Sequence, residues 1–223
     1  MKLAASSWVN TLQWDACHPG SLILEDPCLF RQAAEDLAKQ ELGEDGKLVF
    51  SEDGELLSLA RDGLLIRDLW AMDLNQKKLL TGVQKQLVKI GQEEYFSEIL
   101  TLQEQLEQLL QGVMKDSMLP LLWDPPANIL PFLKAVSLRL ETPEDPFERL
   151  IDLVRLSREF LHIRFLVLLG QRAFLTEREC CALCRDLANA QVPVLFIDSG
   201  VRYRMAGERQ LILDLDHCEL LLT

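Results

Sequence analysis

Four lysines, Lys77, Lys78, Lys85 and Lys89, lie in a segment from residue 74 to residue 92 that contains no aspartate or glutamate. On a helix turning about 100° per residue, Lys78, Lys85 and Lys89 fall on one side. The chain as a whole carries a formal net charge of -12. Phosphate groups respond to local positive charge rather than to the total charge of a protein. The stripe therefore predicts contact with a nucleic-acid backbone, and a solvated helix face is the alternative.

Carboxylates flank the proline-rich segment that follows this lysine-bearing region. They are Asp116, Asp124, Glu141, Glu144 and Asp145. Calcium takes six to eight oxygen ligands, often from carboxylates and loop carbonyls. The acids lack the regular spacing of an EF-hand, so solvated side chains are the alternative to a calcium site. A magnesium-dependent nuclease would need acids fixed around a phosphate, and the strand-end acids Glu25, Asp26 and Asp198 cannot be shown to converge from the sequence.

The sequence gives little support for nucleotide hydrolysis, zinc chemistry or nucleophilic catalysis. No glycine-rich nucleotide-binding motif follows the first strand, where Asp26-Pro27 places an acid and a missing amide. Cys180 and Cys184 share a helix face, and the cysteines of this helix alternate with Ala182 and Leu183, which favours core packing over zinc binding. No histidine lies in a recognised nucleophile motif. We read the six cysteines as reduced thiols and do not expect an enzyme.

A long helical region must carry the lysines. Residues 75–118 show no strand pattern, and Leu80, Val83, Leu87 and Ile90 would form the buried side opposite the lysines. Further along, apolar residues recur at steps of four, three and four. These residues are Leu102, Leu106, Leu109 and Val113. We expect a helical hairpin that bends at residues 91–94, ends at prolines, and packs its exposed stripe against another subunit.

Alternating strands and helices flank this region, which predicts an α/β fold with a mixed sheet. The expected strands are 21–25, 47–51, 64–67, 164–169 and 193–198. The expected helices are 27–41, 146–161 and 176–190. Residues 1–74 plus 135–223 should form the head domain, and residues 75–134 an inserted helical leg domain.

Length and composition agree with a globular, cytoplasmic protein. The chain has 223 residues, of which 48% are hydrophobic, enough for one large domain or one domain with an insertion. No apolar run is long enough for a membrane span.

The order of three segments resembles a known family. The segments read SLILEDPCLFRQAAEDL, GLLIRDLWAMDLNQKKLL and RFLVLLGQRAFLTERECCALCRDLANAQVPVLFID. This collinear arrangement is similar to the type II-A CRISPR-associated spacer-acquisition proteins of the Csn-two family. Glu25 and Asp26 match its first strand end, the triplet beginning at Asp73 matches the entry to its helical leg, and residues 173–176 match the turn before its late helix. These motifs are structural rather than catalytic.

The resemblance implies a non-enzymatic homotetrameric ring that encircles double-stranded DNA, prefers DNA ends and uses calcium. It also implies action with the CRISPR integrase and effector nuclease in spacer acquisition, an antiviral defence. Lys77, Lys78, Lys85 and Lys89 would then contact phosphates, and calcium would be held by Asp116, Asp124 and Glu141. The segment at residues 123–126 is richer in proline and poorer in carboxylates than that of the family. The alternatives are a protein-interaction module that binds no DNA and a metal-dependent nuclease.

Overall fold

The structure, a computed structural model, describes residues 1–117, 122, 126, 128–200 and 202–223. It divides into two compact units, residues 1–74 with 142–223 and residues 75–141. The first unit holds two sheets and the helices that cover them, and the second is helical. Among the described residues no helix is long and apolar enough to cross a membrane.

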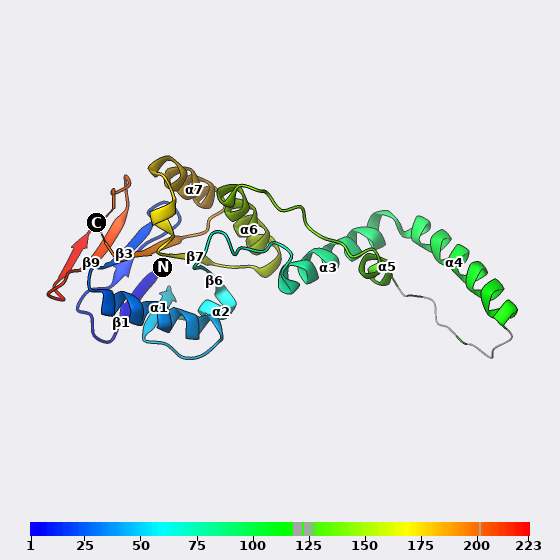
Figure 1. The fold of residues 1–223 in the computed structure, drawn as a ribbon, viewed down its shortest axis with the longest axis horizontal. Helices are drawn as coiled ribbons and strands as arrows, with labels where there is room; N and C mark the ends of the chain where they lie inside the picture. Colours follow the sequence, from blue (N-terminus) through cyan, green and yellow to red (C-terminus); the bar gives the residue numbers. More distant parts are fainter. Residues whose placement is uncertain (118–121, 123–125, 127, 201) are drawn as a thin grey trace. The chain divides into compact units, whose positions relative to one another are not determined.

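A six-stranded mixed sheet forms the centre of the first unit (Figure 1), with the strand order β10-β9-β3-β8-β7-β6. The strands are β3 (Gly20–Leu24), β6 (Gly63–Ile66), β7 (Phe165–Leu169), β8 (Val194–Asp198), β9 (Arg209–Leu213) and β10 (Glu219–Leu222). Strands β9, β3, β8, β7 and β6 are parallel, and β10 pairs antiparallel with β9. Every residue of β3, β7 and β8 is buried, because a parallel sheet is covered on both faces and its strands are mostly apolar.

Helices pack on the two faces of this sheet. They are α1 (Pro27–Glu41), α2 (Leu59–Asp62), α6 (Pro146–Leu161), the 3-10 helix η1 (Gln171–Phe174) and α7 (Glu177–Asn189). Figure 1 shows α6 and α7 on one side of the sheet and α1 on the other. The starts of the helices follow from local chemistry: Asp26 and Asp145 each accept a backbone N–H and precede a proline, and Thr176 forms a capping box with Glu179.

A second, four-stranded antiparallel sheet has the order β2-β1-β4-β5. Its strands are β1 (Lys2–Ala5), β2 (Leu12–Gln13), β4 (Leu48–Glu52) and β5 (Glu55–Leu57). Phe50 of this sheet stacks on Phe165 of β7, with ring centroids 4.9 Å apart. Leu3, Trp14 and Leu37 join the same buried cluster. The main core therefore lies between the small sheet with α1 and one face of the large sheet.

The predicted α/β architecture is confirmed, and the helices predicted at 27–41 and 146–161 have the predicted bounds. The predicted strands lie within a residue or two of β3, β4, β6, β7 and β8. The sequence interpretation missed β1, β2, β9, β10 and the single-turn helix α2.

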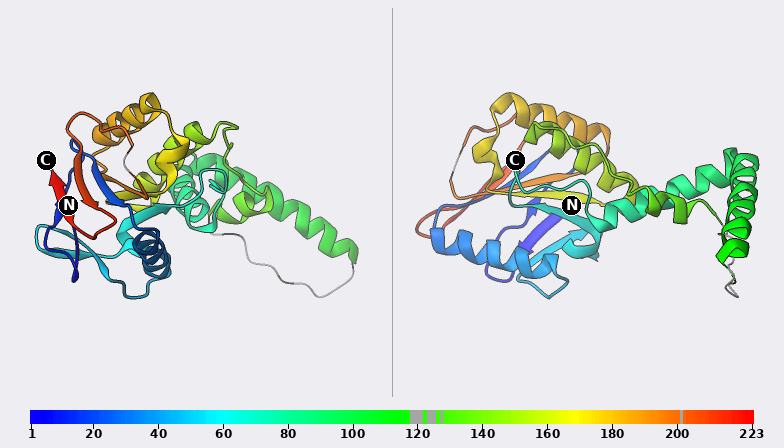
Figure 2. Two further views of the ribbon diagram at one scale, coloured as in Figure 1. Left: turned by 60° about the vertical axis from the view of Figure 1, so that its left-hand side comes forward. Right: turned by 45° about the vertical axis from the view of Figure 1, so that its right-hand side comes forward.

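The second unit contains α3 (Lys77–Glu94), α4 (Phe96–Ser117) and α5 (Leu130–Ala135). The predicted bend at residues 91–94 is wrong, because the helical pattern breaks at Tyr95. Gly91 is buried inside α3, where an added Cβ would lie 3.1 Å from Ile99 and 3.3 Å from Ile129. Its small size permits close packing rather than a turn. Figure 2 shows α4 turning away from α3 instead of lying along it, as two arms of a hairpin would.

Candidate nucleic-acid interface

The four predicted lysines all lie exposed on α3. Lys77 and Lys78 occupy its first turn, which contains no acidic residue, and Gln76 makes no side-chain capping hydrogen bond. The N-terminus of a helix carries a partial positive charge, so lysines there oppose the helix dipole. The start of α3 is therefore strongly electropositive and would be stabilised by a bound anion.

The opposite side of α3 is less enclosed than the sequence predicted. Leu79 is fully buried, whereas Leu80, Val83, Leu87 and Ile90 are only half-buried. The helix packs against α4 near the bend and against the short helix α5. One face of α3 therefore has only partial cover within its own unit.

A groove of about 590 Å³ runs between α3 and α5. Its lining combines aliphatic side chains with lysines and uncharged polar groups. The lysines are Lys77 and Lys85 of α3 and Lys134 of α5. No carboxylate lines the groove among the described residues. The sequence analysis missed Lys134, because its place beside α3 depends on how α5 packs.

Lys89 lies near the acidic end of α3. Its Nζ is 3.9 Å from the Glu93 carboxylate, and both side chains are more than 60% exposed. An exposed pair of this kind contributes about 0.3–0.5 kcal/mol and is screened by salt. Lys89 is therefore available for an anion, although Glu93 weakens its local potential.

The structure describes two of the three predicted calcium ligands, Asp116 and Glu141. Asp116 is exposed in the last turn of α4. Glu141 is exposed next to Leu140, which exchanges two hydrogen bonds with Asn75 just before α3. Asp124 lies outside the described residues. In the part of the chain that the structure describes, no three His, Cys, Asp or Glu side chains are placed to hold a metal ion. The calcium site stays a prediction that Asp116 and Glu141 alone do not support.

Two of the strand-end acids of the head, Asp26 and Asp198, have environments that do not suggest a metal site. Asp26 caps α1 and lies 2.9 Å from His217 Nε2, and the hydrogen bonds from Cys28 and His217 lower its pKa. Asp198 is buried, and burial raises its pKa to about 6. A carboxylate held in this way is a poor ligand for a cation unless the metal displaces its proton. The arrangement therefore offers no support for the nuclease alternative.

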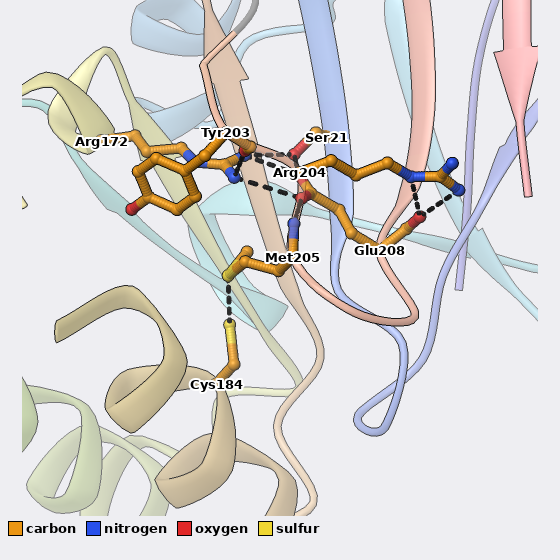
Figure 3. A network of polar contacts seen from close by, with 7 residues as sticks. All are labelled: Ser21, Arg172, Cys184, Tyr203, Arg204, Met205 and Glu208. Carbon is orange, nitrogen blue, oxygen red and sulfur yellow. Dashed lines mark hydrogen bonds and ion pairs between the residues drawn. The ribbon is translucent and has the colours of Figure 1, made fainter. Parts of the chain in front are cut away.

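A buried polar network lies between the large sheet and α7 (Figure 3). Arg172 donates to both oxygens of Glu208, to Ser21 Oγ and to the carbonyl of Tyr203. The Arg172 guanidinium also lies over the Tyr203 ring, 4.6 Å from its centroid. Glu208 further accepts the Met205 N–H. These contacts tie the segment before β9 to the sheet, so the network is structural. The two partners are 36 residues apart in the sequence, and no local pattern predicted their pairing.

All six cysteines are free. Cys180 is buried, and Cys184 Sγ lies 3.9 Å from Met205 Sδ. Burial raises the pKa of Cys184 to about 12. Metals bind thiolates rather than thiols, so these residues pack the core, as predicted.

Helix α4 presents an uncovered apolar stripe. The exposed fractions of Leu102, Leu109 and Val113 are 44%, 63% and 57%, and Ile99 is the one residue of α4 that is fully buried among those described. Exposed apolar stripes of this kind are typical of interaction surfaces.

A protein-family model described as CRISPR-associated protein (Cas_Csn2) matches residues 40–217. The match includes the whole helical unit and most of the α/β unit, but not β1, β2, β3, β10 or most of α1. A search of curated proteins gives no match.

Proposed function

Since the chain belongs to the CRISPR-associated Csn2 family, which implies a role in CRISPR adaptation, we propose that it binds double-stranded DNA without cutting it. The binding form would be a homotetrameric ring that threads onto DNA ends. It would act in the cytoplasm with the CRISPR integrase and effector nuclease while new spacers are acquired, and calcium is proposed as its cofactor.

The single observation that supports DNA binding most is the exposed lysine surface of α3. Lys77, Lys78, Lys85 and Lys89 all face solvent in a segment without acids, on a chain whose net charge is -12. Lysines neutralise phosphates and release counterions, which supplies affinity without reading the base sequence. The surrounding acids repel DNA elsewhere, so they favour entry of an end into a basic ring over binding to the outside.

The exposed stripe of α4 supports assembly. Leu102, Leu109 and Val113 repeat at coiled-coil spacing and are 44%, 63% and 57% exposed. A second copy would bury this stripe, and identical subunits commonly close into symmetric oligomers. The same stripe is the observation that favours the second candidate function, a protein-interaction module whose lysines are merely solvated.

Salt-dependent binding to linear duplex DNA separates the two candidates. We expect the double variant K78Q/K85Q to reduce the slope of log K against log salt by about 0.9 for each phosphate that the lysines no longer neutralise. Symmetry in an oligomer would multiply this reduction. The control K39Q/K47Q removes two lysines from α1 and the start of β4 and should leave the slope nearly unchanged. Equal slopes for both variants would contradict the proposed role of α3.

A further inference from the structure

Two aromatic side chains stand exposed side by side on the α/β unit. Trp70, in the loop after β6, is 57% exposed, and Phe174, at the end of η1, is 56% exposed. Their rings meet edge to face, with centroids 4.8 Å apart and an interplanar angle of 82°. Exposed apolar side chains that adjoin one another indicate an interaction surface, and aromatic side chains dominate the binding energy of protein interfaces.

The loop around Trp70 exposes its largest apolar side chain while burying the smaller ones. Leu69 and Met72 are 2% and 8% exposed. The loop therefore does reach the core, yet Trp70 is directed outward. The exposure of Trp70 is not explained by a lack of space in the core. If the position only met water, a polar residue would be more favourable there than tryptophan.

Three side chains fix this loop. Gln171, which is 4% exposed, accepts the Leu69 N–H at 3.1 Å and donates to the carbonyl of Arg67 at 2.5 Å. Asp68 accepts the N–H of Trp70 at 2.8 Å. Arg149 donates to the Trp70 carbonyl at 3.4 Å. An aromatic anchor held in this way loses little conformational entropy on binding, which favours affinity.

The surroundings of the pair are acidic. Segments 67–74, 143–149 and 171–179 meet here through the hydrogen bonds of Gln171 and Arg149. Together they carry seven carboxylates and four arginines. Two of these arginines, Arg67 and Arg172, already form ion pairs with Glu41 and Glu208 from other segments. The three segments that meet beside the rings therefore have a net formal charge of -3.

We propose that Trp70 and Phe174 form a docking site for an arginine-bearing segment of a different protein. A guanidinium is attracted to aromatic faces by the cation–π interaction and to the nearby carboxylates by charge. A second copy of this chain fits poorly, because a symmetric contact would bring two acidic patches together. DNA is repelled by the same acids. The site does not rest on the proposed DNA binding.

Binding of a nona-arginine peptide to the full-length protein, followed by tryptophan fluorescence, tests the proposal. The peptide should change the emission of the exposed Trp70, and the variant W70F should remove the Trp70 contribution to that change, leaving only the contributions of Trp8, Trp14 and Trp123. The double variant W70A/F174A should bind the peptide about fivefold more weakly when affinity is measured by the anisotropy of a labelled peptide, which does not depend on Trp70. A nona-lysine peptide should bind more weakly than nona-arginine to the wild type and should not distinguish the two forms.

A matched control removes exposed aliphatic side chains elsewhere on the same unit. V49A/L56A changes residues that are 41% and 70% exposed on the small sheet and should leave peptide affinity unchanged. Equal affinity of wild type and W70A/F174A for nona-arginine would overturn the proposal. A lower oligomer mass for W70A/F174A would instead assign the site to a second copy, and weaker DNA binding would assign it to nucleic acid. Either result would also overturn it.

Discussion

Replacing Glu208 by glutamine should destabilise the α/β unit strongly, because Glu208 is fully buried beside a buried arginine. The exposed fractions of Glu208 and Arg172 are 0% and 3%. The two Glu208 oxygens accept hydrogen bonds from Arg172, Ser21 and Met205. Burial opposes ionisation of Glu208, but the hydrogen bonds from Arg172 and Ser21 outweigh it and lower its pKa.

The expected cost of E208Q is about 3 kcal/mol. Removing one partner of a buried ion pair costs about 3–5 kcal/mol, because the other charge is left uncompensated. The lower end of this range applies to E208Q, because the glutamine side-chain oxygen can still accept a hydrogen bond from Arg172. Replacing both residues, as in R172M/E208L, should cost less than the sum of the two single changes, since an apolar pair leaves no buried charge.

Urea unfolding followed by circular dichroism measures this cost as a shift in midpoint at an unchanged slope. The control D152N breaks the Asp152–Arg155 pair, whose arginine side chain is 71% exposed, and should change stability by less than about 1 kcal/mol. Because the folded-state pKa of Glu208 is lowered, its contribution is present above the unfolded pKa and is lost as the pH falls through the folded value. A destabilisation below about 1 kcal/mol for E208Q would refute the reasoning.

Three further predictions concern the core, the helices and assembly. The folded-state pKa of Asp198, about 6, exceeds its ordinary value of 3.8, so the free energy of unfolding should fall as the pH rises between these two values. At pH 8 the variant D198N should raise the free energy of unfolding by up to about 3 kcal/mol. The same pH profile of stability for D198N and the wild type would contradict this. G112A should stabilise α4 by about 0.5–1 kcal/mol, because an added Cβ meets nothing within 4 Å. G91A should destabilise the helical unit, because an added Cβ would crowd Ile99 and Ile129. The thermal unfolding midpoints of the two variants should therefore shift in opposite directions. L109Q/V113Q should lower the oligomer mass measured by light scattering without loss of helical circular dichroism, and an unchanged mass would exclude the α4 stripe from assembly.

The parallel strands of the head could be predicted because they are continuous apolar runs between turn signals. The short strands β1 and β2 could not, since KLAA and LQ carry little pattern and depend on pairing with distant residues. The break at Tyr95 was misplaced because Gly91 resembles a helix breaker, whereas the structure uses its missing side chain for packing.

Part of the candidate site could also be predicted. The lysines of α3 were found from helical spacing alone, and the structure leaves all four exposed. The neighbouring Lys134 and the groove that it lines could not be found, because they arise from the packing of α5 on α3. The aromatic pair was missed because Trp70 and Phe174 lie 104 residues apart and meet only through the adjacent strands β6 and β7.

The central claim is that this chain forms a basic ring around duplex DNA. The most direct measurement compares its binding to linear and covalently closed circular duplexes of equal length, with and without calcium, alongside the oligomer mass in solution. The account predicts salt-sensitive binding to the linear form alone, by a species with the mass of a tetramer. Equal binding to both forms would contradict end threading, and binding to neither would leave the lysines of α3 a solvated face.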